Sequence, residues 1–312
     1  MKVSHDGRPS GGRRASVLAP LVPYCTKTRR YRARTIARTN ERDCRRHPQC
    51  CAGRGAIWTA GLPHASLGSF GWVEGGAQAM VAAFLAEACT VIVPTFSWGF
   101  AVPPPASDRP ARNGWDYDEF PGPAAGLGRV YNPSSNEIDR DMGAVPAAVL
   151  LWPGRWRGDH PLSSFSAAGP LAGVLISAQR PWDVWAPLRA LVEAGGSVVL
   201  MGVGFDSMTL LHLAEQMAGR KPFVRWANGP DGRPMGVQVG GCSNGFHKFE
   251  PVLRPLTTSC RVGNSLWQVV PARQAVEQAA AAIRKRPRIT HCAAPGCGRC
   301  RDAVLGGPIA PR

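Results

Sequence analysis

Apolar and polar positions alternate along most of the chain in blocks that predict strands and helices in turn. Short apolar runs rich in β-branched residues predict strands, whereas apolar positions that recur every three or four residues predict amphipathic helices. The predicted strands cover residues 90–96, 164–168, 198–201, 222–227 and 236–239. The predicted helices cover residues 77–88, 142–152, 182–193, 208–217 and 272–284. Because strands and helices alternate, the pattern predicts a layered α/β domain.

One stretch, Ser197 to Gln216, combines a predicted strand, turn and helix with a set of polar side chains. A glycine-rich turn follows the apolar strand, and Asp206 is a good N-cap residue for the helix. On this helix Thr209, His212 and Glu215 recur every three residues, so they lie close to one face. Ligand sites in open α/β sheets lie beyond the carboxyl ends of strands, which makes the triplet a candidate catalytic site. The alternative is a core helix with a hydrogen-bonded histidine.

Positive charge is concentrated at the start of the chain. The 312 residues carry a formal net charge of +16, of which residues 1–55 contribute +11. This arginine-rich segment lacks apolar periodicity, so residues 1–56 are predicted to be a disordered or mistranslated leader. The folded domain is predicted at 57–288 and a cysteine-rich tail at 289–312. The domain has no basic stripe interleaved with aromatic residues, which argues against a nucleic-acid partner, and its interrupted apolar runs predict no membrane span.

Seven of the ten cysteines lie near the two ends of the chain, and the other three are scattered through the body. This distribution differs from the disulfide framework of a small secreted protein, so it favours the reducing cytosol. In the tail, Cys297 and Cys300 have the CxxC spacing of two metal ligands on one turn, and Cys292 lies shortly before them. With His291 or Cys242 as a fourth ligand, they would complete a tetrahedral site for structural zinc. The alternative is a group of reduced cysteines without a metal.

Eight sequence blocks follow one another between His64 and Val276. They are HASLGSFGWVEGG (64–76), TVIVPTFSW (90–98), NGWDYD (113–118), DMGAVPAAVLLWPG (141–154), HPLSSFSAAGP (160–170), VVLMGVGFDSMTLLHLAE (198–215), GCSNGF (241–246) and the RVGN and PARQAV pieces (261–276). In this order and spacing they resemble the aminoglycoside 3-N-acetyltransferase family, the antibiotic acetyltransferases that lack the GNAT fold. The resemblance implies a layered α/β/α domain with a central mixed sheet. It also implies transfer of an acetyl group from acetyl-CoA to an amine of an aminoglycoside.

The candidate helix offers the chemistry that this reaction needs. Most amines are protonated at neutral pH, so attack on a thioester requires a base, and an unperturbed histidine titrates near pH 6.5, at about the right value. The resemblance places the catalytic histidine at His212, within the motif TLLHLAE (209–215). Glu215 would orient the ring and stabilise the imidazolium. Thr209 would donate its hydroxyl to the thioester oxygen.

The resemblance further implies sites for both substrates. The loop after the first strand, the end of the next strand and the HPLSS segment are expected to line the acetyl-CoA site, through Ser66, Leu67, Pro94, Thr95, His160 and Ser164. A polycationic acceptor requires acidic groups, and those on loops are joined by one tyrosine: Asp116, Tyr117, Asp118 and Asp206. The alternatives are ordinary turn chemistry for the first set and a solvated acidic loop for the second.

The chain departs from the family near its first block. Family members begin with a helix and a strand that ends in a VHSSL-like turn, whereas IWTAGLP (57–63) stands here. Because Pro63 lacks a backbone donor, the first strand is expected to be missing or rewritten. Three alternatives to an aminoglycoside acetyltransferase stay open: an acetyltransferase for another metabolite amine, an inactive relic of the family, or a zinc-stapled basic binding protein. A monomer or a homodimer is expected.

Overall fold

The structure is a computed structural model that describes residues 59–119 and 122–309. The predicted leader at residues 1–56 lies outside the described residues. The predicted domain after Trp58 and most of the cysteine-rich tail lie within them. None of the helices in these two ranges is long and apolar enough to cross a membrane.

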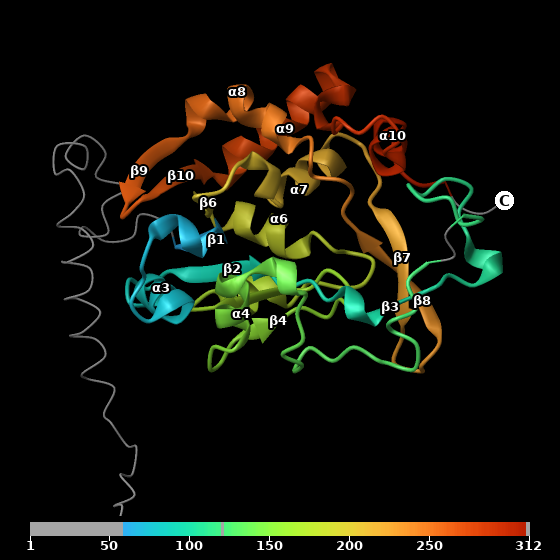
Figure 1. The fold of residues 1–312 in the computed structure, drawn as a ribbon, viewed down its shortest axis with the longest axis horizontal. Helices are drawn as coiled ribbons and strands as arrows, with labels where there is room; N and C mark the ends of the chain where they lie inside the picture. Colours follow the sequence, from blue (N-terminus) through green and yellow to red (C-terminus); the bar gives the residue numbers. More distant parts are fainter. Residues whose placement is uncertain (1–58, 120–121, 310–312) are drawn as a thin grey trace, which may run out of the picture.

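A seven-stranded mixed sheet lies at the centre of the fold, with the strand order β4-β5-β2-β1-β6-β10-β9 (Figure 1). The three central strands β2, β1 and β6 are parallel, and the strands on either side of them run antiparallel to their neighbours. In sheet order the strands are β4 (Trp156–Arg157), β5 (Phe165–Ala168), β2 (Thr90–Pro94), β1 (Ala60–Ala65), β6 (Ser197–Met201), β10 (Ser265–Pro271) and β9 (Thr258–Val262). The predicted α/β fold with a central mixed sheet is confirmed.

The expectation that the first strand is missing was wrong. β1 lies in the middle of the sheet and pairs with β6 over residues 61–65, although it contains Pro63. The peptide groups of a strand point alternately to its two neighbours. The N–H of Ser66 donates to the carbonyl of Met201 on β6, so the backbone nitrogen of Pro63 faces β2. The ladder between β1 and β2 ends at Gly61, so the proline interrupts no pairing.

Helices cover both faces of the sheet. α3 (Gly76–Leu85) and α4 (Ala144–Leu150) pack on one face, and α5 (Ala172–Ile176), α6 (Ala186–Glu193), α7 (Leu210–Met217) and α9 (Ala272–Lys285) pack on the other. The burial of β6 explains why its residues from Val198 to Met201 are all apolar. Val198 and Leu200 enter the core under α6 and α7, whereas Val199 and Met201 enter the core under α3 and α4. Because successive side chains alternate between faces, a strand buried on both sides needs an unbroken apolar run.

The order of the parallel strands creates a place for a ligand. β1 is joined through α3 to β2 on one side, and β6 pairs with the other side of β1. Such a reversal of strand order is a topological switch point, where ligands bind beyond the carboxyl ends of the strands. At this edge Ala65 and Met201 are paired in register. α7 begins shortly after Met201, so the predicted catalytic helix starts at the switch point.

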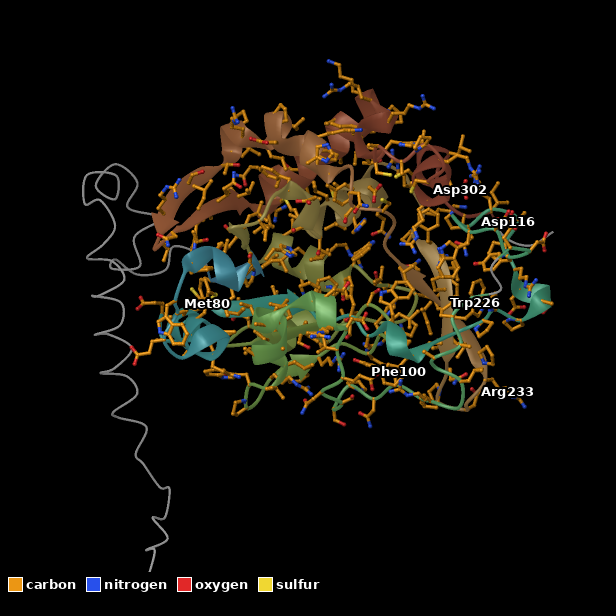
Figure 2. The ribbon with its side chains drawn as sticks, in the orientation of Figure 1. Met80, Phe100, Asp116, Trp226, Arg233 and Asp302 are labelled. Carbon is orange, nitrogen blue, oxygen red and sulfur yellow. The ribbon has the colours of Figure 1, made fainter. Side chains whose placement is uncertain are left out.

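A second, three-stranded sheet flanks the main body at one end (Figure 1). Its order is β3 (Ala101–Val102), β7 (Phe223–Asn228) and β8 (Pro234–Val239). Phe100 and Trp226 are buried here, at the opposite end of the molecule from Met80 of α3 (Figure 2). A short helix, α8 (Glu250–Leu253), follows the second sheet along the chain.

The cysteine-rich tail packs against this second sheet. It forms α10 (Gly298–Val304), whose Ala303 joins the core that contains Phe100 and Val237. Asp302 of α10 is 2% exposed and accepts the backbone N–H of Gly114 at 2.7 Å. The tail is therefore attached to the body by apolar and polar contacts.

Candidate active site

His212 and Glu215 form a hydrogen-bonded pair on α7. Nδ1 of His212 lies 2.9 Å from Oε2 of Glu215, and the two side chains are only 10% and 11% exposed. A carboxylate can only accept a hydrogen bond, so the neutral imidazole carries its proton on Nδ1. Nε2 is then left with its lone pair, which is the state that a general base requires.

Two aromatic rings and one glycine fix the plane of the His212 ring. The indole of Trp185 stacks on it with an interplanar angle of 9° and 5.4 Å between centroids. Phe246 lies on another side, 4.8 Å away between centroids. The backbone of Gly240 approaches the opposite ring edge so closely that a Cβ there would lie 3.1 Å from Nε2. A side chain at position 240 would therefore crowd Nε2 of His212.

Arg220 binds the other carboxylate oxygen of Glu215. Nη1 of Arg220 donates to Oε1 of Glu215 at 2.7 Å and to Oγ1 of Thr290, also at 2.7 Å. Nη2 donates to the carbonyl of Pro287. This buried ion pair keeps the carboxylate aimed at His212 and compensates for the desolvation penalty that a lone buried carboxylate would carry.

Thr209 lies at the start of α7 and joins it to β1. Its backbone N–H donates to Nε2 of His64 at 3.4 Å. Burial lowers the pKa of His64 to about 4, so the ring is neutral at pH 7 and able to accept. Ser66 and Leu67 follow β1 directly, beside the end of β6. The hydroxyl of Ser66 makes no capping hydrogen bond to the turn after it. The structure thus brings Thr209, the first residue of the predicted catalytic set, to the end of β1, next to the first pair of predicted acetyl-CoA residues.

The other predicted acetyl-CoA residues are buried. Pro94 ends β2, and Thr95, His160 and Ser164 are 0% exposed. Oγ1 of Thr95 lies 3.2 Å from Oγ of Ser164, and Nε2 of His160 donates to the carbonyl of Gln238 at 2.7 Å. These three side chains are engaged within the protein.

The predicted acceptor residues fall into two groups. Asp206 is exposed between β6 and α7, three residues before Thr209. Asp116, Tyr117 and Asp118 lie instead beside α10, where Figure 2 shows Asp116 next to Asp302. Tyr117 is 7% exposed and accepts a hydrogen bond from the Asn113 side-chain amide, and burial raises its pKa.

Two hollows lie beside the His212–Glu215 pair. The first has a volume of about 20 Å³ and is lined by His212, Trp185 and Gly240 among others, which is room for about one water molecule. The second is a groove of about 390 Å³ that shares Arg220 and Gln216 with the first. A groove of this volume is within the range of small-molecule sites.

Residues 62–284 match the family model of aminoglycoside 3-N-acetyltransferases. The chain belongs to this family. The aminoglycoside N(3)-acetyltransferase IX of Micromonospora chalcea is 37% identical over 162 residues, which cover 50% of this chain and 54% of that protein. The aminoglycoside N(3)-acetyltransferase VIII of Streptomyces fradiae is 36% identical over 169 residues, with coverage of 50% and 54%. The chain therefore spans about half the length of the curated relatives that it matches.

Solved structures of aminoglycoside 3-N-acetyltransferases have the same fold. The apoenzyme of aminoglycoside acetyltransferase AAC(3)-IVa is 25% identical, with a TM-score of 0.61, and the match covers 79% of this chain and 89% of that one. A histidine-to-alanine mutant of the same enzyme, in complex with a gentamicin, has a TM-score of 0.60 at 24% identity and covers 79% and 90%. The resemblance seen in the sequence blocks is thereby confirmed.

Several residues of the site carry no signal in the sequence. Trp185, Phe246 and Gly240 reach His212 from three separate segments, so no local spacing reveals them. Arg220 is the exception, because it lies little more than one turn beyond Glu215. An arginine just past the end of a helix that carries a buried carboxylate is a signal that could have found it.

Proposed function

We propose that this chain transfers the acetyl group of acetyl-CoA to the 3-amino group of an aminoglycoside, with His212 as the general base. The observation that carries the proposal is the 2.9 Å contact between Nδ1 of His212 and Glu215, at the switch point of a chain of this family. It leaves Nε2 of His212 unprotonated beside a space that admits a small group.

The reaction follows from this geometry. Nε2 of His212 removes a proton from the amine as its nitrogen attacks the thioester carbon. The carbonyl oxygen becomes an oxyanion, to which the Thr209 hydroxyl donates. The C–S bond then breaks, and the imidazolium returns the proton to the CoA sulfur. Glu215 stabilises the imidazolium between these steps, and Arg220 keeps Glu215 in place.

Acetyl-CoA is proposed to bind at the carboxyl ends of β1 and β2. Ser66 and Leu67 are placed to contact it, since they follow β1 beside the end of β6. Pro94 would line the same edge. Thr95, His160 and Ser164 are buried and form hydrogen bonds within the protein. Their proposed role is therefore to hold the end of β2 against β5.

The acceptor is proposed to be polycationic. Asp206 is the predicted acidic residue that lies beside α7, so it would bind an ammonium group of the sugar close to His212. Asp116 and Asp118 are exposed on a loop by α10 and would act on a more distant part of the acceptor. Relatives named aminoglycoside N(3)-acetyltransferases and the gentamicin complex of AAC(3)-IVa support an aminoglycoside.

Release of CoA thiol, measured with a panel of aminoglycosides and simple polyamines, tests the proposal. We expect turnover with aminoglycosides, and a loss of about 10²–10⁴-fold in His212→Gln, which keeps most of the volume between Trp185 and Phe246. His247→Gln is the control, because His247 is exposed on a neighbouring turn. Turnover only with simple polyamines would assign another acceptor, and no thiol release with any amine would refute the enzyme proposal.

A further inference from the structure

Four cysteines from three segments meet between the second sheet and α10. Cys242 lies just after β8, Cys292 follows the 3-10 turn Pro287–Thr290, and Cys297 and Cys300 lie at the start of α10 and within it. Their four Sγ atoms all lie within 4.8 Å of one another. None of the four forms a disulfide. Thiols from distant parts of the chain come together here. Packing of the core alone does not explain this, because other small apolar side chains would fill the same space equally well.

The spacing fits a tetrahedral metal ion. A Zn–S bond of about 2.3 Å places the sulfurs of a tetrahedral site about 3.8 Å apart, along the edges of the tetrahedron. The observed upper limit of 4.8 Å exceeds this by an amount that small side-chain rotations remove. Cys292 and Cys300 are 7% and 2% exposed, which shields the centre from water. Four sulfur ligands and no open position are the pattern of a structural site rather than a catalytic one.

The groups around the cysteines suit thiolates. The backbone N–H of Cys292 donates to Sγ of Cys300 at 3.2 Å, and a donor of this kind stabilises a negatively charged sulfur. Nζ of Lys248 donates to the carbonyl of His291 at 2.5 Å, which puts a positive charge next to the cluster. His291 is not among the residues whose ligand atoms converge, and its Nδ1 donates to the carbonyl of Cys292 at 2.6 Å. Of the two candidates for the fourth ligand, the geometry selects Cys242 and not His291.

We propose that Cys242, Cys292, Cys297 and Cys300 bind one structural Zn²⁺ ion, which clamps the C-terminal segment onto the domain. The ligands join segments that touch the catalytic pair from two directions. Cys242 is two residues from Gly240, whose backbone abuts the His212 ring. Cys292 is two residues from Thr290, which accepts from Arg220, the partner of Glu215. The metal would therefore also position His212 and Glu215, and this second statement rests on the proposed function.

Metal analysis of the purified full chain, prepared with reduced thiols, tests the site directly. We expect about one zinc per chain, and Co²⁺ substitution is expected to give the strong charge-transfer and visible bands of a tetrahedral thiolate site. Cys297→Ser should lose the metal, whereas Cys260→Ser, a cysteine of β9 outside the cluster, should retain it. His291→Ala should also retain zinc, and a loss of metal there would reassign the fourth ligand and overturn the four-cysteine site.

Two further results would refute the proposal even if Cys297→Ser does not fold. One is wild-type protein without zinc and without cobalt bands. The other is an intact mass that shows disulfides among the four cysteines in freshly prepared protein. Zinc content and thermal stability with and without a chelator are measured in His212→Gln as well. Zinc in wild-type protein that acetylates no amine would leave the metal site standing and refute only the proposed function.

The positioning effect has its own readout. Removal of zinc from folded wild-type protein is expected to lower kcat while the KM for acetyl-CoA stays unchanged, because the donor residues after β1 lie away from the cluster. A parallel fall in activity and in the amount of folded protein, measured by near-UV circular dichroism, would show a clamp that holds the fold but does not position His212.

Discussion

The main sheet and the described parts of the long connection, residues 103–119 and 122–143, are held in place by different interactions. The main sheet is fixed by apolar side chains on both faces, such as Val198 and Val199. The connection is fixed by buried polar side chains that bond to backbone groups. Arg157 donates to the carbonyls of Thr95, Ser135 and Glu137 at 2.7–2.9 Å. Apolar patterns are visible in a sequence, whereas bonds of this second kind are not.

The proposed catalytic pair belongs to the first region, although its supports come from elsewhere. His212 and Glu215 lie on a helix that packs on the main sheet. Gly240 follows the second sheet, and Thr290 lies near the cysteine tail. Two residues that lie close together in the sequence therefore depend on distant segments for their orientation.

The largest expected effect follows from Glu215→Gln in the main-sheet region. The neutral amide no longer stabilises the imidazolium or fixes the Nδ1 proton, so kcat should fall about 10²-fold or more. Steady-state kinetics of acetyl transfer measure this. Glu250→Gln is the matched control, since Glu250 is half-exposed and pairs with the exposed Arg254. A Glu215→Gln variant with wild-type kcat would remove Glu215 from the mechanism.

Leu200→Ala probes the apolar cohesion of the main sheet. Leu200 is 0% exposed in the core under α6 and α7, so the lost contacts and the cavity should lower the free energy of unfolding by about 2–5 kcal/mol. Chemical denaturation gives the value. Leu266→Ala on β10, where the side chain is 44% exposed, should change it by about 0.5 kcal/mol at most. Equal losses in the two variants would contradict the placement of the core.

Arg157→Met probes the polar cohesion of the connection. It leaves buried carbonyl groups without donors, which should cost about 3 kcal/mol of unfolding free energy. Unlike Leu200→Ala, it should also open the connection locally, so limited proteolysis should cut faster near Ser135. Arg233→Met, in the exposed turn between β7 and β8, serves as the control. Unchanged cleavage near Ser135 would show that Arg157 does not anchor this segment.

The smallest expected effect is a pH dependence where the main sheet meets the second sheet. His160 donates from Nε2 to Gln238 of β8, and its Nδ1 accepts the N–H of Ser163. Burial lowers its pKa to about 4, below the ordinary 6.5. Below pH 6.5 the unfolded chain therefore binds a proton at His160 that the folded chain does not bind. The contribution of His160 to the free energy of unfolding is complete above pH 6.5 and is lost as the pH falls toward 4. Between pH 7.5 and 5 the loss should be about 2 kcal/mol.

Denaturant midpoints at the two pH values measure this loss. His160→Gln offers the same acceptor and donor without titrating, so the part of the pH dependence due to His160 should disappear. His247→Gln, with an exposed side chain, should keep the wild-type dependence. If His160→Gln retained the full slope, the buried neutral state of His160 would be wrong.

The amino-acid sequence by itself determined the α/β layering and the helix that carries the proposed catalytic pair. Apolar runs such as Val198 to Met201 predict buried strands because burial on both faces requires them. The three-residue spacing of His212 and Glu215 predicts their contact because it places them on adjacent turns of one helix. The CxxC at Cys297 and Cys300 likewise predicts two sulfurs on one turn.

Only the tertiary structure decided how these pieces meet. Pro63 suggests a broken strand, yet the strand forms because the proline nitrogen faces the side where pairing has already ended. The sequence allowed His291 or Cys242 as the companion of the tail cysteines, and the fold brings Cys242 to them across some fifty residues of chain. Trp185 and Gly240 reach His212 in the same way. The reason is physical: contacts between distant segments depend on the path of the whole backbone, for which local spacing carries no signal.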